Sequence, residues 1–278
     1  MFMDKFDCVV VHYDEIGLKG SNKVFFERLL MKAIIQKLKG IKCRVIRESG
    51  QLTVMFTSSP DYGVVKDIFS RIPGIAYFSF CVKCDLDIDE IKKESLKVLS
   101  SKEFKSFKID ARRHNKEYKM KSSEINVALG DAVVIAMKKK VDHTNPEVTL
   151  KVEISNKNAY ISCESIQGVG GLPTDSRQKM VSLLSGGFDS PVAAFMMMKR
   201  GCEVVFVHFS NKNQEASMVQ DKITDLVKQL SKYQLHTVLH IVPFEDVQKE
   251  IIMKVPADTR MLIYRRFMIR IASKIADL

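Results

Sequence analysis

A chain of 278 residues, 46% of them hydrophobic, is long enough for two or three small domains, each with its own core. No apolar run approaches the roughly 20 residues that cross a bilayer, and the N-terminus lacks a signal-peptide layout. The six cysteines are scattered and lack the dense spacing of a secreted disulfide framework. We therefore expect a cytoplasmic protein with reduced thiols and no membrane partner. The net charge of +11 favours polyanionic partners, nucleic acid above all, although an ordinary basic protein would show the same excess.

The first part of the chain alternates strand and helix patterns without a repeat. Apolar and β-branched runs predict strands, and apolar residues at helical spacing predict helices. The predicted strands cover residues 7–13, two segments of 43–57 around a Ser-Gly turn, 75–83, 106–114, and a hairpin of 147–155 with 158–166. The predicted helices cover residues 22–40, 61–72, 87–100 and 122–140. The Gly-rich segment 168–176 marks the main boundary, near residue 172.

The rest of the chain predicts a doubly wound parallel sheet. Strand patterns at residues 180–184, 203–209 and 236–244 alternate with helical patterns at 190–201, 216–233 and 257–278. Near-continuous apolar strands between helices are typical of parallel sheets with right-handed crossovers. Because no strand follows the last helix to cover its apolar face, we interpret this domain as C-terminally truncated.

The segment SGGFDS at 185–190 lies between the first of these strands and its helix. Ligands of parallel sheets bind beyond the carboxyl ends of the strands, which is where this segment lies. The glycine amides, the serine hydroxyls and a helix N-terminus suit a phosphate group. Asp189 is the odd member, since a carboxylate repels phosphate unless a cation such as Mg²⁺ mediates. The segment matches neither a Walker A loop nor a nucleophile elbow. The alternative is an ordinary turn in which Asp189 caps the helix.

Several motifs, in order, resemble the ThiI family of tRNA 4-thiouridine synthetases. The SGGFDS segment is similar to the loop of the PP-loop ATP pyrophosphatases, which cleave ATP to AMP and pyrophosphate while adenylating a substrate. Residues 12–30 resemble the opening of the ThiI family, and residues 107–126 and 152–173 resemble its THUMP domain, a module associated with RNA. Residues 183–201 resemble its catalytic domain.

This resemblance implies a multidomain α+β and α/β protein. It places a ferredoxin-like domain at 1–59, a THUMP domain at 60–167, a linker at 168–178 and a PP-loop domain at 179–278, which in the family continues further. The implied activity is ATP-dependent: uridine 8 of tRNA is adenylated and then receives sulfur to give 4-thiouridine. ATP and Mg²⁺ would be required, with tRNA and a sulfur-donor protein or persulfide source as partners, and a homodimer is compatible with the family.

Two other functions stay open. The chain could be a tRNA-binding module with an inactive nucleotide-binding domain, or another PP-loop ligase that modifies RNA. ATP binding distinguishes the first of these from the enzyme.

The resemblance also implies a set of ATP contacts. They are Leu183 and Leu184 through their backbones, Ser185, Gly186, Gly187, Asp189 and Ser190 at the phosphates, His208 and Phe209 at the nucleotide, and Arg265 on the last helix. Asp189 is the candidate catalytic residue, as an organiser of the loop and of Mg²⁺, and no other metal site is expected. Each contact has a structural alternative: the leucines are core residues, His208 is a satisfied buried histidine, and Arg265 lies on a solvated basic face.

The basic run 102–121 is the candidate tRNA contact. A charge run is usually a solvated face, but the THUMP resemblance and the net charge favour phosphate binding here. The candidate residues are Lys108, Arg112, Arg113, Lys116 and Lys119, with the two arginines best placed near a strand end.

Cys81 and Cys84 have the CxxC spacing of redox and zinc sites. Positions three apart in a strand face opposite sides, so we expect this pair to have no joint function.

Overall fold

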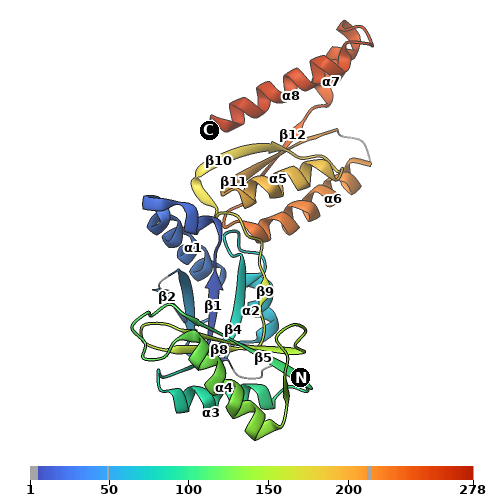
Figure 1. Cartoon of the computed structure of the whole chain (residues 1–278). Helices are drawn as coiled ribbons and strands as arrows, with labels where there is room; N and C mark the ends of the chain where they lie inside the picture. Colours follow the sequence, from blue (N-terminus) through green and yellow to red (C-terminus); the bar gives the residue numbers. More distant parts are fainter. Residues whose placement is uncertain (1–5, 49, 212–214, 278) are drawn as a thin grey trace. The chain divides into compact units, whose positions relative to one another are not determined.

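The structure is a computed structural model that describes residues 6–48, 50–211 and 215–277; Ser49, in the predicted Ser-Gly turn, lies outside them. The chain divides into two compact units, Met1–Gly170 and Gly171–Leu278, so the division falls inside the Gly-rich segment. Figure 1 shows the elements of both units. In the described part of the chain, no helix has the length and apolar character needed to cross a membrane.

Within the described residues, the first unit is built on a nine-stranded sheet of order β2-β3-β1-β4-β8-β7-β5-β6, with β9 paired to β4. The strands are β1 (Cys8–His12), β2 (Cys43–Glu48), β3 (Gln51–Phe56), β4 (Tyr77–Cys84), β5 (Ser106–Arg113), β6 (Lys140–Val141), β7 (Val148–Ile154), β8 (Ala159–Ser162) and β9 (Ile166–Gln167). The helices are α1 (Lys23–Lys37), α2 (Tyr62–Phe69), α3 (Ile88–Ser100) and α4 (Ser122–Met137). The predicted hairpin is confirmed, since β7 and β8 pair antiparallel.

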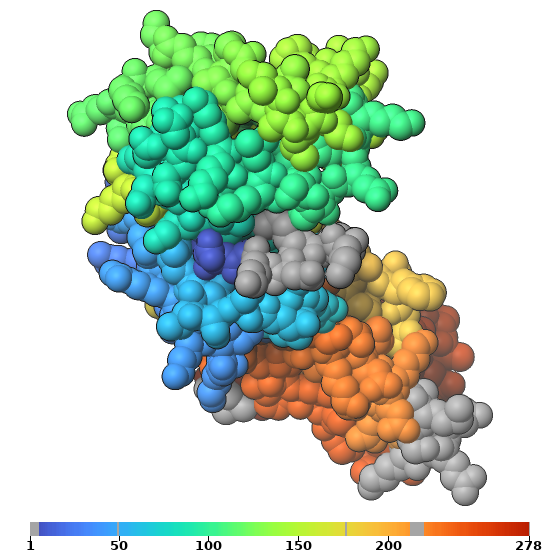
Figure 2. Space-filling view, turned by 90° about the horizontal axis from the view of Figure 1, so that it is seen from below, coloured from blue at the N-terminus to red at the C-terminus, as the bar shows by residue number. Residues whose placement is uncertain are grey.

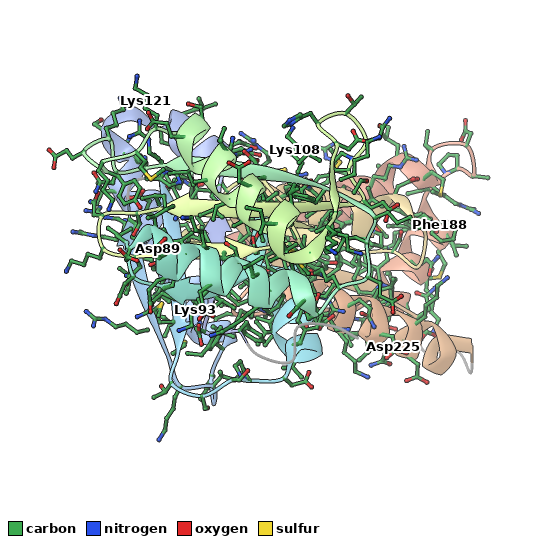
Figure 3. The ribbon with its side chains drawn as sticks, turned by 60° about the horizontal axis from the view of Figure 1, so that its bottom comes forward. Asp89, Lys93, Lys108, Lys121, Phe188 and Asp225 are labelled. Carbon is green, nitrogen blue, oxygen red and sulfur yellow. The ribbon has the colours of Figure 1, made fainter. Side chains whose placement is uncertain are left out.

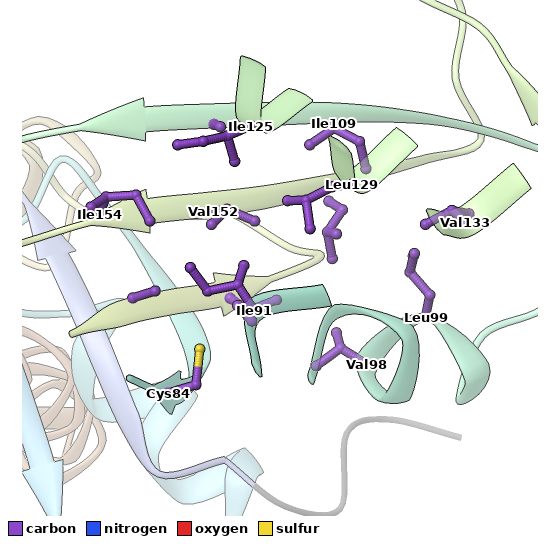
Figure 4. Close-up of a cluster of buried hydrophobic side chains, with 14 of the residues drawn as sticks. Cys84, Ile91, Val98, Leu99, Ile109, Ile125, Leu129, Val133, Val152 and Ile154 are labelled. Atoms are coloured by element: carbon purple, nitrogen blue, oxygen red, sulfur yellow. The ribbon is translucent and has the colours of Figure 1, made fainter. Parts of the chain in front are cut away.

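Alternation along the strands gives this sheet two different faces. On one face, apolar residues of β5, β7 and β8 pack against α3 and α4, as Figure 4 shows for Ile109, Val152 and Leu129. The two helices also form part of the outer surface, in teal and green in Figure 2. The opposite face carries a second, smaller cluster that includes Cys8 and Tyr160.

The two cysteines of the CxxC spacing belong to these different clusters. Cys84 packs in the core under α3 and α4, whereas Cys81 packs beside Cys8 on the other face. The prediction that they face opposite sides of the strand is therefore confirmed. Burial raises the pKa of the Cys84 thiol to about 12, which keeps it protonated and unreactive.

The sheet is strongly curled around the face that carries Cys8 and Tyr160. The Tyr160 hydroxyl on β8 donates to Glu48 Oε1 on β2 at 3.2 Å, and the Ser155 hydroxyl donates to the same oxygen at 3.3 Å. In a flat sheet β2 and β8 would lie four strand spacings, about 19 Å, apart. Two side chains cannot span that distance, so the contact requires strong curvature. The curled sheet thus joins the strands of residues 8–84 and of residues 106–167 in one unit.

The second unit has a parallel sheet of β10 (Asp175–Leu183), β11 (Cys202–Ser210) and β12 (Val238–Pro243). Its helices are α5 (Asp189–Lys199), α6 (Glu215–Leu230), α7 (Glu245–Lys254) and α8 (Arg260–Ala276). Residues of α5 and α6, such as Met198 and Ile223, pack on Phe206 of β11, while the C-terminal end of α8 lies against β10 on the other side of the sheet (Figure 1). Helices on both faces confirm the doubly wound architecture.

One helix and one strand boundary in the second unit differ from the prediction. Helix α7 was not predicted, because its short amphipathic turns follow directly on a strand pattern that ends at residue 244. Strand β10 begins at Asp175 rather than near residue 180, within the segment expected to be a linker. Its first residues are polar and carry no strand pattern. The Asp175 amide donates a backbone hydrogen bond to the Gly201 carbonyl at 2.9 Å, which holds the start of the strand in place.

The start of the second unit is bound to the end of α5. The Leu172 amide donates to the Lys199 carbonyl at 2.9 Å. Gly171 just before it has a φ of +75°, and a Cβ there would lie 2.1 Å from the Lys199 carbonyl oxygen. Both the backbone conformation and the close approach therefore require glycine at this position.

This requirement predicts that Gly171→Ala destabilises the second unit by about 1–3 kcal/mol, through strain and a forced backbone shift. Gly130→Ala is the matched control, because Gly130 lies inside α4 with nothing within 4 Å of the added methyl, and it should stabilise its helix by about 0.5–1 kcal/mol. Urea unfolding followed by circular dichroism measures both. Equal midpoints for Gly171→Ala and the wild type would contradict the close approach.

Candidate functional site

The loop 185–190 lies where the parallel strands of the second unit end. One residue separates it from β10, which ends at Leu183, and its last two residues form the start of α5. The ends of β11 and β12 meet at the same edge, since Ser210 pairs with Pro243. Backbone amides, helix N-termini and strand-end side chains therefore converge on this edge, as the sequence predicted.

Two serine hydroxyls organise the loop. The Ser190 hydroxyl accepts a hydrogen bond from the Ser185 amide at 2.9 Å and lies 3.0 Å from the Ser185 hydroxyl. The Ser185 hydroxyl in turn accepts from the Gly187 amide at 3.4 Å. The loop is thus folded back on itself by hydrogen bonds among Ser185, Gly187 and Ser190.

The N-terminus of α5 has no side-chain cap. Phe188 occupies the cap position, is 91% exposed (Figure 3), and offers no acceptor to the first amides of the helix. Asp189 is the first residue of the helix, so the alternative in which Asp189 caps an ordinary turn is not what the structure has. An uncapped helix N-terminus next to a glycine loop is a favourable place for an anion.

The base of the loop is fixed to β11. The Leu184 amide donates to the Val207 carbonyl at 2.8 Å, and the Leu184 side chain is buried. His208, only 7% exposed, places Nδ1 2.9 Å from the Leu184 carbonyl oxygen. Since a carbonyl can only accept, Nδ1 carries the proton of this bond. His208 therefore holds the backbone that starts the loop.

A chain of aromatic rings connects β11 to α8. Phe209 contacts Phe244 edge-on with 5.2 Å between ring centroids, and Phe244 contacts Tyr264 at 6.2 Å. Arg265, exposed on α8, is the residue after Tyr264. The sequence analysis missed Phe244 and Tyr264; the position of Phe244 directly after a strand pattern was the available signal.

The structure separates the candidate RNA-binding residues of the first unit. Lys108 and Arg112 share one face of β5, and Figure 3 shows Lys108 on this strand. Arg112, with a side chain 57% exposed, is ion-paired with Asp110 at 3.1 Å. Arg113 is on the opposite face, half-buried, and donates to the Tyr118 carbonyl at 3.2 Å. Lys116 and Lys119 are exposed in the segment between β5 and α4.

A buried cluster that the sequence analysis missed lies behind Arg112. Glu153 of β7 accepts from His12 Nε2 at 2.9 Å, and its other oxygen is 3.4 Å from His114 Nε2. Burial opposes the charged carboxylate, but its contacts with His114 and His12 outweigh that effect and lower the pKa of Glu153 to about 2. The strand pattern gave no signal for this cluster, because Glu153 falls on the polar side of an alternating strand, with Thr149 and Lys151.

The cluster extends to the surface through an aromatic ring. The His12 ring stacks on Tyr77 with 4.4 Å between centroids, and Lys151 Nζ lies 5.9 Å from the centre of the Tyr77 ring. Lys151 is next to Asp110 in the β5–β7 register. Lys108, Arg112 and Lys151, with Tyr77, thus form a basic face with one aromatic ring, which we call the β5–β7 basic face.

Three family models match consecutive segments of this chain. A ThiI ferredoxin-like domain matches residues 8–79, a THUMP domain matches 86–164, and the model described as thiamine biosynthesis protein (ThiI) matches 175–278.

Curated relatives are similar over nearly the whole chain. A protein of Thermoanaerobacter sp. (strain X514) is 40% identical over 98% of this chain and 71% of its own length, and one of Brevibacillus brevis is 35% identical over 98% and 69%. Both are named as tRNA sulfurtransferases. This chain therefore spans about 70% of the length of these relatives.

Two solved structures have a similar fold. A 4-thiouridine synthetase in complex with RNA and ATP is 34% identical, with a TM-score of 0.85 over 98% of this chain and 71% of that one. A Pyrococcus horikoshii protein is 28% identical, with a TM-score of 0.76 over 88% of this chain and 81% of that one.

The buried carboxylate of Glu153 predicts an acid-dependent stability. A carboxyl whose pKa falls from 4.5 to about 2 on folding stabilises the folded state above about pH 4.5 and loses that effect as the pH falls towards 2. We expect Glu153→Gln to lower the free energy of unfolding near neutral pH by about 2–3 kcal/mol and to flatten this acid dependence.

Urea unfolding of the wild type and of Glu153→Gln over a pH series measures this acid dependence. The control is Glu117→Gln at an exposed position, which should change stability by less than about 0.5 kcal/mol. A Glu153→Gln variant as stable as the wild type at neutral pH would show that the two histidines do not stabilise the charge.

Proposed function

The chain belongs to the ThiI family of tRNA sulfurtransferases, and we propose that it binds tRNA and ATP, adenylates uridine 8 and prepares it for sulfur transfer to give 4-thiouridine. The observation that carries this proposal is the loop 185–190, which the two serines fold back on itself beside the uncapped N-terminus of α5. The 4-thiouridine synthetase solved with RNA and ATP supports it, because its fold covers 98% of this chain.

The proposed chemistry solves a leaving-group problem. The C4 oxygen of uracil is a poor leaving group, so it first attacks the α-phosphorus of ATP, and the bond to pyrophosphate breaks. The terminal sulfur of a persulfide on the donor would then attack C4, and AMP would depart with the original oxygen. A second thiol of the donor would attack the inner sulfur of the persulfide, which forms a disulfide and releases 4-thiouridine. A sulfur-donor protein or persulfide source supplies the sulfur, and our proposal includes a homodimer as the assembly.

The residues present fit ATP as the substrate. The loop amides and the hydroxyls of Ser185 and Ser190 would hold its phosphates, while Gly186 and Gly187 leave the approach free of side chains. Asp189 would hold Mg²⁺ on these phosphates, a role that suits an exposed carboxylate at the first turn of α5. Phe209 and Arg265 would contact the nucleotide, and His208 would act by holding Leu184.

We assign tRNA binding to the β5–β7 basic face and the exposed Lys116 and Lys119. Cations and one aromatic ring on a single face suit a phosphate backbone with an adjacent base or sugar. Arg113 is a weaker candidate than Arg112, because its hydrogen bond to Tyr118 holds it in the turn. The Glu153 cluster would set the position of Tyr77 beneath this face.

The loop predicts how ATP binding responds to substitution. Ser190→Ala removes the hydroxyl that bonds Ser185, and Asp189→Ala removes the proposed Mg²⁺ ligand, so each should weaken ATP binding by about tenfold or more. Asp225→Ala is the control, since this exposed acid on α6 pairs only with Lys228 among the described residues. Isothermal titration with Mg²⁺ and ATP measures all four proteins. Equal affinity in all four would rule out this loop as the nucleotide site.

The basic face predicts a salt-dependent affinity for tRNA. Arg112→Ala should weaken binding and reduce the slope of log K against log salt by about one, the change for one lost phosphate contact. Lys93→Ala, at an exposed position of α3, is the matched control and should leave the slope unchanged. Filter binding of the whole chain to tRNA and to an unstructured RNA of equal length provides the data. Identical slopes for both variants, or equal affinity for both RNAs, would show that this surface is a solvated face and does not bind tRNA.

A further inference from the structure

Lys222 of α6 lies against the glycine loop. A Cβ placed on Gly186 would be 3.8 Å from Lys222 Nζ and Cδ and 3.9 Å from Cε. The outer half of the lysine side chain therefore runs alongside the loop backbone. The adjacent residue Ile223 is fully buried in the core of the second unit, which fixes this turn of α6.

The loop itself supplies no positive charge. Residues 183–190 contain one carboxylate, Asp189, and no lysine or arginine. Backbone amides and a helix N-terminus contribute about half an elementary charge, whereas ATP carries several negative charges and releases pyrophosphate. The Mg²⁺ proposed at Asp189 would neutralise part of this charge, and a cation from another element would balance the charge that remains on the terminal phosphates.

Lys222 is available for this role. Its side chain is exposed, and it forms no ion pair within the residues that the structure describes. Lys228, two turns further along α6, is in contrast paired with Asp225 at 3.0 Å. Since Lys222 has no acid to neutralise it in the described residues, its charge remains for a ligand of the loop.

The position of Lys222 also indicates which phosphates it would contact. The proposed contacts place the nucleotide end of the site at the end of β11, next to Leu184, whose carbonyl His208 holds. Gly186 lies beyond it, towards α5, so a ligand that extends from Leu184 past Gly186 brings its terminal phosphates to the lysine.

We propose that Lys222 binds the β- and γ-phosphates of ATP and stabilises the pyrophosphate that leaves. This inference rests on the proposed function, because it deepens the assignment of loop 185–190 as the ATP site. Lys222 would then be a substrate-binding residue of the adenylation step, contributed by the second helix of the domain rather than by the loop.

The experiment compares three ligands, ATP, pyrophosphate and AMP, by isothermal titration of the whole chain with Mg²⁺. Lys222→Ala should weaken ATP and pyrophosphate by about tenfold or more and leave AMP unchanged, because AMP lacks the terminal phosphates. Lys222→Arg should restore most of the affinity, since it keeps the charge. Lys228→Ala is the matched control on the same helix and should bind all three ligands as the wild type does.

Each other outcome has a distinct meaning. If the wild type binds ATP and Lys222→Ala binds it equally well, the role of Lys222 is overturned and the proposed function stands. If Lys222→Ala weakens AMP as much as ATP, or if Lys228→Ala has the same effect, the assignment to the terminal phosphates is overturned. If the wild type binds none of the three ligands, the nucleotide site itself is wrong. Circular dichroism of each variant confirms that it is folded.

Discussion

The carboxylate of Glu153 is the interaction on which the first unit depends. A buried charge is costly unless it is paired, and Glu153 meets this condition only where His12 and His114 reach it from β1 and from the residue after β5. Because β1 belongs to the ferredoxin-like segment and β5 and β7 to the THUMP segment, one charge joins both parts. The Tyr77 ring of the basic face stacks on His12 of this cluster.

The second unit uses backbone rather than charge to build its site. His208 and Val207 hold Leu184 from β11, and the two serines hold the loop that follows. No loop side chain in 185–190 provides a hydrophobic anchor, since Phe188 points into solvent. The position of the loop therefore comes from the strand beneath it, while its chemistry comes from its own amides and hydroxyls. This division leaves the charge balance to a neighbouring helix, where Lys222 lies.

The two candidate surfaces differ in how the chain assembles them. The proposed nucleotide site is mostly local: residues 183–190 follow one another, and its other proposed contacts are His208, Phe209, Lys222 and Arg265 of α8. The basic face is non-local, since Tyr77, Arg112 and Lys151 come from three strands. A motif can indicate the first kind of site. The second kind exists only after strands far apart in the chain have paired.

The sequence by itself determined the strands and most helices, the opposite faces of Cys81 and Cys84, and the SGGFDS loop, because periodicity and local motifs are properties of neighbouring residues. Only the tertiary structure decided that the Tyr118 carbonyl holds Arg113, that His12 and His114 share one carboxylate, and that Lys222 lies beside Gly186. Helix α7 and the early start of β10 also depended on packing rather than on local pattern. The physical reason is the same in each case. Burial, strand pairing and curvature bring together residues that are far apart in the sequence, and their spacing along the chain does not predict the contact.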